Sequence, residues 1–384
     1  MIIKKIFLGL VSIVLLAIIL AYVTGNGFLI TAIQNTYLQG NNTANINDYT
    51  AFDTNQIKTS EPAPLPKSAD YNKHELSKEF LQRLEDFKSV SYLVVKDGEV
   101  VSEHYMNGYN DRSKTNSFSM AKTVTTMLIG IAIEEGFIKS LEQPLIDFLP
   151  EFKDDPLGNK ATIGQLSLMT SGYEWTEHYY SPFSPTVQLL YGSDVEDFLL
   201  QGSFSAEPGT FWEYSSASTQ LLGILLKRAL HAGGKEVTVS EYLSEKIWQP
   251  LQMNDYAPWH TDAEGLELTF CCLNTNARNY AKLGLLMLNN GVWNGQQLVP
   301  NSFIQTMIQP LGTSYYGYST WLALDNDPAY YHFSGHLGQF IIVVPEHNMV
   351  VVRLGETRDN SIDFRTEETP EYVRQALALI SEQN

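Results

Sequence analysis

SMAKTVTTMLIGIA, residues 119–132, is the stretch that decides the fold of this chain. Its apolar residues recur at helical spacing, which predicts a buried helix. Ser119 and Lys122 stand three residues apart at the start of that helix, nearly one turn, so their side chains face the same way. A desolvated amine can accept the proton of a serine hydroxyl as acyl transfer begins, and a helix N-terminus favours the negative charge that develops there. The pair therefore predicts a nucleophile and its base.

An N-cap serine followed by a solvated lysine is the alternative interpretation of this pair. A chain this rich in serine should contain roughly one Ser-x-x-Lys match by chance. Two later stretches favour the catalytic interpretation. Tyr214-Ser215-Ser216 precedes an amphipathic helix predicted over 217–229, and His336-Leu337-Gly338-Gln339 precedes an apolar strand predicted over 340–344.

The order Ser-x-x-Lys, Tyr-x-Ser, His-x-Gly resembles the three motifs of the serine β-lactamase and penicillin-binding-protein superfamily. Similar proteins are the class C β-lactamases, the D-alanyl-D-alanine carboxypeptidases, the related esterases and 6-aminohexanoate-dimer hydrolase. The resemblance implies that Ser119 forms an acyl-enzyme, that Lys122 helps to deprotonate Ser119, and that Tyr214 is the general acid and base. It covers residues 75–380, with supporting stretches at 166–172, 262–265, 274–285 and 291–300.

Further expectations concern the groups around the nucleophile. The pKa of the Tyr214 phenol, ordinarily about 10, can fall beside cationic groups, which would suit a general base. His336 would either orient Tyr214 or bind an anionic group of the substrate. The resemblance implies that the backbone N–H groups of Ser119 and Gln339 form the oxyanion hole. Gly338 would let the substrate approach the strand closely.

Two residues depart from the motifs of the β-lactamases and peptidases. Ser216 stands where those enzymes usually place Asn, so an amide that would hydrogen-bond a substrate acylamide is missing. Leu337 follows His336, so a lysine ammonium and a threonine hydroxyl that favour a carboxylate-bearing substrate are missing too. The sequence thus predicts a serine hydrolase, an esterase or amidase. The alternatives are a β-lactamase or D-alanyl-D-alanine carboxypeptidase acting on β-lactams or peptidoglycan peptides, and a non-catalytic receptor or scaffold, against which the intact motif residues argue.

The composition of the chain limits the classes of partner that the protein is expected to bind. The 384 residues carry a formal net charge of -18, which argues against nucleic acid or an anionic membrane surface as a partner. Cys271 and Cys272 are adjacent, and we expect two small buried thiols because a bond between neighbours would be strained. Metal-ligand spacing and a phosphate-binding glycine loop are both absent from the sequence, so no metal and no cofactor is predicted. The expected partner is a small-molecule or peptide substrate.

The N-terminus predicts an attachment to a membrane. Lys4 and Lys5 precede an uncharged apolar run from Ile6 to Val23, which is long enough to span a bilayer. The position of the charges places the N-terminus in the cytoplasm and the catalytic part on the periplasmic or extracellular side. We therefore interpret residues 1–23 as a signal anchor, or transmembrane helix. The alternative is a signal peptide cleaved after Ala21-Tyr22-Val23, which would release a secreted enzyme.

The rest of the chain divides into a polar linker, 24–72, and a hydrolase domain, 73–384. Asp97-Gly98 predicts a hairpin turn, because glycine accepts a positive φ. Strands near both termini with mostly helical sequence between them, over 117–300, predict an α+β fold: one antiparallel sheet flanked by helices, plus an inserted mostly helical subdomain. The predicted strands are 91–96, 99–105, 340–344 and 349–354, and the predicted terminal helices are 73–87 and 370–382.

An aromatic loop over residues 173–183 follows Ser171-Gly172. One interpretation is a lid over the substrate, and the other is a packed surface loop.

Overall fold

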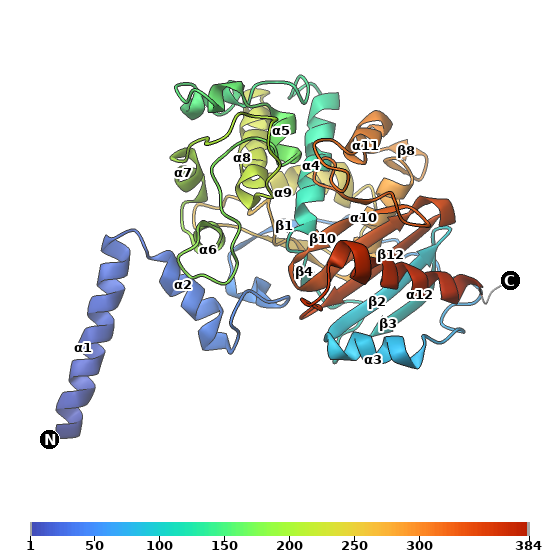
Figure 1. Cartoon of the computed structure of the whole chain (residues 1–384), viewed down its shortest axis with the longest axis horizontal. Coiled ribbons are helices and arrows are strands. Elements are labelled where there is room, and N and C mark those ends of the chain that lie inside the picture. The colour runs from blue at the N-terminus through green and yellow to red at the C-terminus, as the bar shows by residue number, and fades with distance from the viewer. Residues whose placement is uncertain (1, 382–384) are drawn as a thin grey trace.

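A six-stranded antiparallel sheet forms the centre of the computed structural model, which describes residues 2–381. Its strand order is β3-β2-β12-β11-β10-β9, so the N-terminal hairpin pairs with strands from the end of the chain, as the sequence predicts (Figure 1). The strands are β2 (Ser89–Lys96), β3 (Glu99–Tyr105), β9 (Trp321–Ala323), β10 (Tyr330–Gly335), β11 (Gln339–Val344) and β12 (Met349–Gly355).

Local sequence explains the centre of this sheet. Asp97 and Gly98 both have positive φ, 54° and 81°, as a tight turn between twisted strands requires. Every residue of β12 is buried, and its run of valines suits a strand covered on both faces. The predicted hairpin at Asp97-Gly98 is thus confirmed.

Helices cover both faces of the sheet. On one face, α3 (Lys78–Asp86) and α12 (Thr369–Ser381) bury a cluster that includes Phe80 and Tyr372. On the other face lies α10 (Ala277–Leu288), where a side chain at Gly284 would press against Val350 of β12. The predicted helix over 73–87 begins later, at Lys78, because Ser77 caps it by accepting a hydrogen bond from the Phe80 N–H. Residue 382 of the predicted final helix lies outside the described residues.

The helical part is built around two buried helices that pack on each other, α4 (Met120–Glu134) and α8 (Ser216–Ala232). Around them lie α5 (Ile163–Ser167), α6 (Pro185–Tyr191), α7 (Val195–Leu200), α9 (Val239–Leu243) and α11 (Asn301–Met307). Short paired strands are β4 (Thr115–Asn116) with β6 (Asn274–Thr275), and β7 (Val292–Trp293) with β8 (Gln296–Gln297). Short turns of 3₁₀ or π type are η2 (Asp48–Ala51), η3 (Leu145–Asp147), η4 (Pro150–Phe152), η5 (Gly158–Lys160), η6 (Ser244–Trp248), η7 (His336–Gly338), η8 (Pro345–His347) and η9 (Phe364–Glu368).

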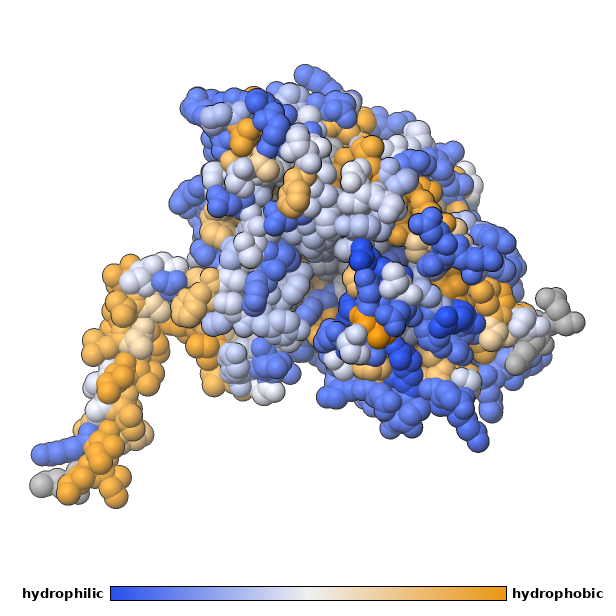
Figure 2. All heavy atoms as spheres, viewed as in Figure 1, coloured by the Kyte–Doolittle hydropathy of each residue, from blue (hydrophilic) through white to orange (hydrophobic). Residues whose placement is uncertain are grey.

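Helix α1 (Ile2–Val23) stands away from the rest of the protein (Figure 1). Its residues bury nothing inside the protein, and its surface is mainly apolar (Figure 2). By length and composition it is the one helix among residues 2–381 that qualifies as a membrane span, and a signal sequence would pass the same test.

Residues 24–72, which we expected to form a linker, are packed into the folded unit. Strand β1 (Thr54–Ile57) pairs with β5 (Ala257–His260), and the side chains of Ile46 and Ile57 are completely buried. Helix α2 (Phe28–Asn35) packs against α6, and η1 (Tyr37–Gln39) follows it. The segment is polar in composition, and its few apolar residues that are buried in the core stand one by one, so they form no recognisable pattern in the sequence. The boundaries proposed at 23 and 72 stay predictions.

Candidate active site

Ser119 occupies the N-cap position of α4, but its side chain makes no capping hydrogen bond. The hydroxyl is therefore free for chemistry, unlike that of an ordinary N-cap serine. Phe118, the preceding residue, has a left-handed backbone with φ 44°, an unusual conformation for a bulky residue and one often found at functional sites. Within the described part of the chain, no acceptor is bound to the Ser119 N–H, which suits the predicted oxyanion role.

Lys122 is buried beside Ser119, not solvated. Its Nζ donates hydrogen bonds to Ser119 Oγ at 3.2 Å, Ser216 Oγ at 3.1 Å and the Phe270 carbonyl at 2.9 Å. Burial lowers the pKa of Lys122 to about 8, against the opposing charge of Glu177. At that pKa roughly a tenth of the amine is neutral at pH 7, enough to provide a base.

Tyr214 completes the group, with a protonation state that differs from our expectation. Its ring centroid lies 5.2 Å from Lys122 Nζ, and its hydroxyl shares a hydrogen bond with Ser119. Burial, together with the charge of Glu177, raises the pKa of Tyr214 above its ordinary value, although the bond to Ser119 acts the other way. The expectation of a lowered pKa is wrong, because burial and the charge of Glu177 outweigh the hydrogen bond with Ser119. Tyr214 is a neutral phenol that can donate a proton.

Glu177 is a site residue that the motifs did not reveal. Its carboxylate accepts hydrogen bonds from the Ser216 N–H at 2.8 Å, the Ser216 hydroxyl at 2.6 Å and Trp175 Nε1 at 2.7 Å. Ser216 accepts from Lys122 and donates to Glu177, so one hydroxyl links the buried amine to a carboxylate. The signal in the sequence was an acidic residue inside the aromatic loop, but no spacing rule connects position 177 to position 216.

His336 lies among aromatic rings. Its ring centroid is 4.9 Å from that of Tyr179, 5.5 Å from that of Phe118 and 6.1 Å from that of Tyr180. Burial, helped by Arg358, lowers the pKa of His336 to about 4, so the imidazole is neutral at physiological pH. A neutral ring has no charge with which to hold an anion. Among the described residues its buried Nε2 has no hydrogen-bond partner.

Gly338 and Gln339 hold the turn after β10 in place. Gly338 has φ 81°, and a Cβ there would collide with the Arg353 guanidinium. The glycine therefore makes room for Arg353, and the close approach of substrate at Gly338 stays a prediction. Gln339 is buried, and its side chain donates to the carbonyls of His336 and Gly355. The oxyanion role of the Gln339 N–H stays a prediction.

A pocket of about 80 Å³ adjoins Ser119 and Ser216. Part of the aromatic loop covers it, because Tyr179 and Tyr180 line the pocket, whereas Tyr173 and Trp175 at the start of the loop are buried in the core. The packed-loop interpretation thus holds for the start of the loop, and a lid over the substrate stays a prediction. In the described range 2–381, no group of three or more His, Cys, Asp or Glu side chains could hold a metal ion.

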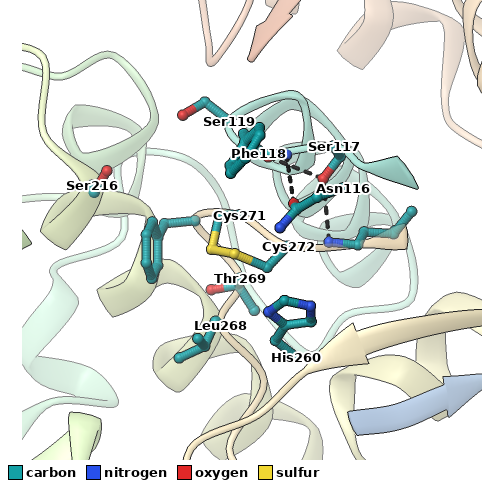
Figure 3. Close-up of a disulfide and its surroundings, with 12 residues drawn as sticks. Asn116, Ser117, Phe118, Ser119, Ser216, His260, Leu268, Thr269, Cys271 and Cys272 are labelled. Carbon is teal, nitrogen blue, oxygen red and sulfur yellow. Dashed lines mark hydrogen bonds between the residues drawn. A yellow bond between two sulfur atoms is a disulfide. The ribbon is translucent and has the colours of Figure 1, made fainter. Parts of the chain in front are cut away.

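Cys271 and Cys272 form a disulfide that also lines this pocket. The bond lies between the turn that carries Ser119 and the ring of His260 (Figure 3). The expectation of two free thiols is wrong, because the turn brings the neighbouring sulfur atoms together. The preceding residue, Phe270, supplies the carbonyl that accepts from Lys122.

The chain matches the sequence profile of the family described as Beta-lactamase over residues 77–371, and it belongs to that family. The protein is a serine hydrolase, as the similar proteins that carry hydrolase names also indicate. The resemblance seen in the three motifs is confirmed.

Two similar proteins share a name. The 6-aminohexanoate-dimer hydrolase of Paenarthrobacter ureafaciens is 26% identical over 238 residues, which span 59% of this chain and 59% of that protein, less than two thirds of its length. A structure described as a putative 6-aminohexanoate-dimer hydrolase from Bacillus anthracis superposes with a TM-score of 0.72 at 26% identity, covering 86% of this chain and 91% of the other. A family VIII carboxylesterase, with a TM-score of 0.60 at 17% identity and coverages of 80% and 99%, shares the fold.

Proposed function

We propose that this enzyme cleaves an ester or amide bond through an acyl-enzyme on Ser119. The observation that carries the proposal is the hydrogen bond from the buried Lys122 Nζ to Ser119 Oγ, in a site where burial makes the amine easier to deprotonate. The names of the similar proteins, a 6-aminohexanoate-dimer hydrolase and a carboxylesterase, support a hydrolase of this kind.

Each proton has a defined path in this mechanism. Neutral Lys122 takes the proton of Ser119 as Oγ attacks the carbonyl carbon, and the N–H groups of Ser119 and Gln339 stabilise the oxyanion. Tyr214 then gives its proton to the departing oxygen or nitrogen and is reprotonated from Lys122. In the second half, water loses a proton to the same base and attacks the acyl carbonyl, and Ser119 regains its proton.

Hydrolysis of β-lactams or peptidoglycan peptides is supported less well. Ser216 directs its hydroxyl to Glu177, and the neutral His336 offers no positive charge to a substrate carboxylate. A non-catalytic scaffold would have no need to keep Lys122 buried with three hydrogen bonds to the nucleophile region.

We propose that the catalytic part lies outside the cytoplasm, anchored by α1 or secreted after cleavage. The apolar helix α1 supports an anchor or a signal sequence, and the Cys271–Cys272 disulfide suits an oxidising compartment. The net charge of -18 supports our expectation that nucleic acid is not a partner.

Covalent labelling tests the nucleophile. Treatment with a small fluorophosphonate should add one group, which peptide mass spectrometry should locate on Ser119. Ser119→Ala should abolish the label, whereas Ser113→Ala, a substitution in the loop before β4, should keep it. Labelling that persists in Ser119→Ala contradicts the assignment. A panel of p-nitrophenyl esters, a chromogenic cephalosporin and D-Ala-D-Ala peptides then ranks the substrate classes.

A further inference from the structure

The pocket beside Ser119 is lined mainly by apolar and aromatic side chains, with uncharged polar ones such as Thr36 and Asn42 among them. Its walls include Ala32 and Ala44 from the segment that follows α1, and Val187 and Leu190 from α6. None of the described residues that line it carries an Asp, Glu, Lys or Arg side chain. An uncharged aliphatic group gains free energy by leaving water for such a site, whereas a charged group loses its hydration without a partner.

The pocket lies on one side of the nucleophile. Ser119 lines it, whereas Tyr214, the proton donor to the leaving group in our mechanism, does not. The leaving group must lie near Tyr214, so the other substituent of the carbonyl carbon, the acyl chain, faces the pocket.

The volume of the pocket limits the length of the acyl chain that it can hold. A water molecule needs about 10–15 Å³ of cavity volume. The pocket, at about 80 Å³, therefore has room for about five to eight groups the size of a water or a methylene.

The wall of the pocket continues toward the apolar N-terminal helix. Helix α2 follows α1 directly and contacts it, and α2 contributes Ala32 while η1 contributes Tyr37. The outer side of this segment is also apolar, since Ile33, Tyr37 and Leu38 are 47%, 60% and 72% exposed. An aliphatic chain coming from an apolar phase around α1 would meet this surface first.

We infer that the pocket binds the uncharged, straight aliphatic acyl chain of the substrate, about six to nine carbons long with the carbonyl carbon included, and that residues 32–44 form its outer wall. The inference rests on the proposed function and adds the class of acyl donor: an aliphatic carboxylic ester or amide whose chain has no charged end.

A chain-length series tests this assignment. The full-length protein in detergent is assayed with p-nitrophenyl acetate, butyrate, hexanoate, octanoate and decanoate, so that only the acyl chain changes. We expect kcat/KM to rise by about fourfold for each methylene that is buried, up to hexanoate or octanoate. The p-nitrophenyl ester of 6-aminohexanoate, which adds an ammonium to the chain, should react at least about tenfold more slowly than the hexanoate ester.

Two neighbouring positions provide a matched pair of variants. Ala32→Phe fills the pocket, and it should reduce the ratio of hexanoate to acetate activity by about tenfold or more. Ile33→Phe places the same side chain on the exposed side of the same helix and should leave the ratio unchanged. Val187→Phe blocks the pocket from α6 and replaces Ala32→Phe if that variant fails to fold.

The outcomes separate this inference from the proposed function. If fluorophosphonate labels Ser119 but the rates do not depend on acyl length, or if Ala32→Phe and Ile33→Phe behave alike, the acyl pocket is wrong and the mechanism stands. A preference for hexyl acetate over ethyl acetate without any acyl preference would place the leaving group in the pocket and also overturn the inference. Failure to label Ser119 at all overturns both.

Discussion

Ser216 connects the buried amine of Lys122 to the partly buried carboxylate of Glu177 through one hydroxyl group. Lys122 and Glu177 both bond to it, so the carboxylate stabilises the protonated amine without a direct contact. The asparagine that β-lactamases and peptidases usually place at this position would present an amide to the substrate instead. In this chain the third residue of the second motif, Ser216, instead bonds to Lys122, the base.

Replacing Glu177 with Gln should move the pH profile of the enzyme. Glu177 raises the pKa of Lys122, so its loss lets the amine deprotonate at a lower pH. If neutral Lys122 is the base, the acid limb of kcat/KM against pH should shift to lower pH in Glu177→Gln. Glu174→Gln, at an exposed position of the same loop, is the control and should keep the wild-type profile. An acid limb that stays in place or rises would exclude this role for Glu177.

Removal of either proton-transfer group should reduce kcat more than it changes substrate binding. We expect a loss of about 10²-fold or more in Lys122→Met and in Tyr214→Phe, because each variant loses a positioned proton carrier. Because the two groups share one proton path, the double variant should be little slower than the slower single variant. Steady-state kinetics on the best ester measure this, with thermal melts to confirm folding. A folded Tyr214→Phe enzyme with wild-type kcat would remove Tyr214 from the mechanism.

A contact between two site residues could be predicted only where the residues are close together in the sequence. Ser119 and Lys122 meet because they are one helical turn apart, so their spacing alone predicts the contact. Glu177 meets Ser216 only because a long loop folds back over α8, and no local pattern encodes that. The pKa of Tyr214 was predicted in the wrong direction, because burial depends on the whole tertiary structure.

At the scale of elements, the strand β1 and the coil before it are part of the core. Ile57→Ala should therefore destabilise the protein by about 2–5 kcal/mol, because it leaves a cavity at a completely buried site. Ile33→Ala, at a position that is 47% exposed, should stay within about 0.5 kcal/mol of the wild type. Denaturant unfolding of both variants measures the difference. Equal stabilities would mean that residues 24–72 are a loosely attached linker after all.

The elements that the sequence predicted well are those with a local cause. The Asp97-Gly98 hairpin depends on two residues that accept a positive φ, and α4 depends on its apolar spacing. The packing of segment 24–72 could not be predicted, because Ile46 and Ile57 are isolated among polar neighbours and neither forms a periodic pattern. Their burial depends on contacts with β5 and the helices, which are distant in the sequence.

At the scale of the whole molecule, we expect α1 to distinguish a membrane-bound full chain from a soluble chain that lacks this helix. We expect the full chain to fractionate with membranes and to resist carbonate extraction, because α1 is long, apolar and unburied. A chain that begins at Gly25 should be soluble and folded, since it keeps α2 and β1. N-terminal sequencing of protein from the membrane fraction provides the check. A mature N-terminus near Thr24 would show that α1 is a cleaved signal peptide.

The Cys271–Cys272 bond has a practical consequence for any preparation of this enzyme. It lines the pocket and follows Phe270, the residue whose carbonyl accepts from Lys122. Protein synthesised in a reducing cytosol would carry two thiols at this position in place of the bond. Batches from different expression hosts would then differ in the lining of the pocket while having the same sequence. Alkylation followed by peptide mass spectrometry will show which form each batch contains, and rates from different laboratories become comparable only after that check.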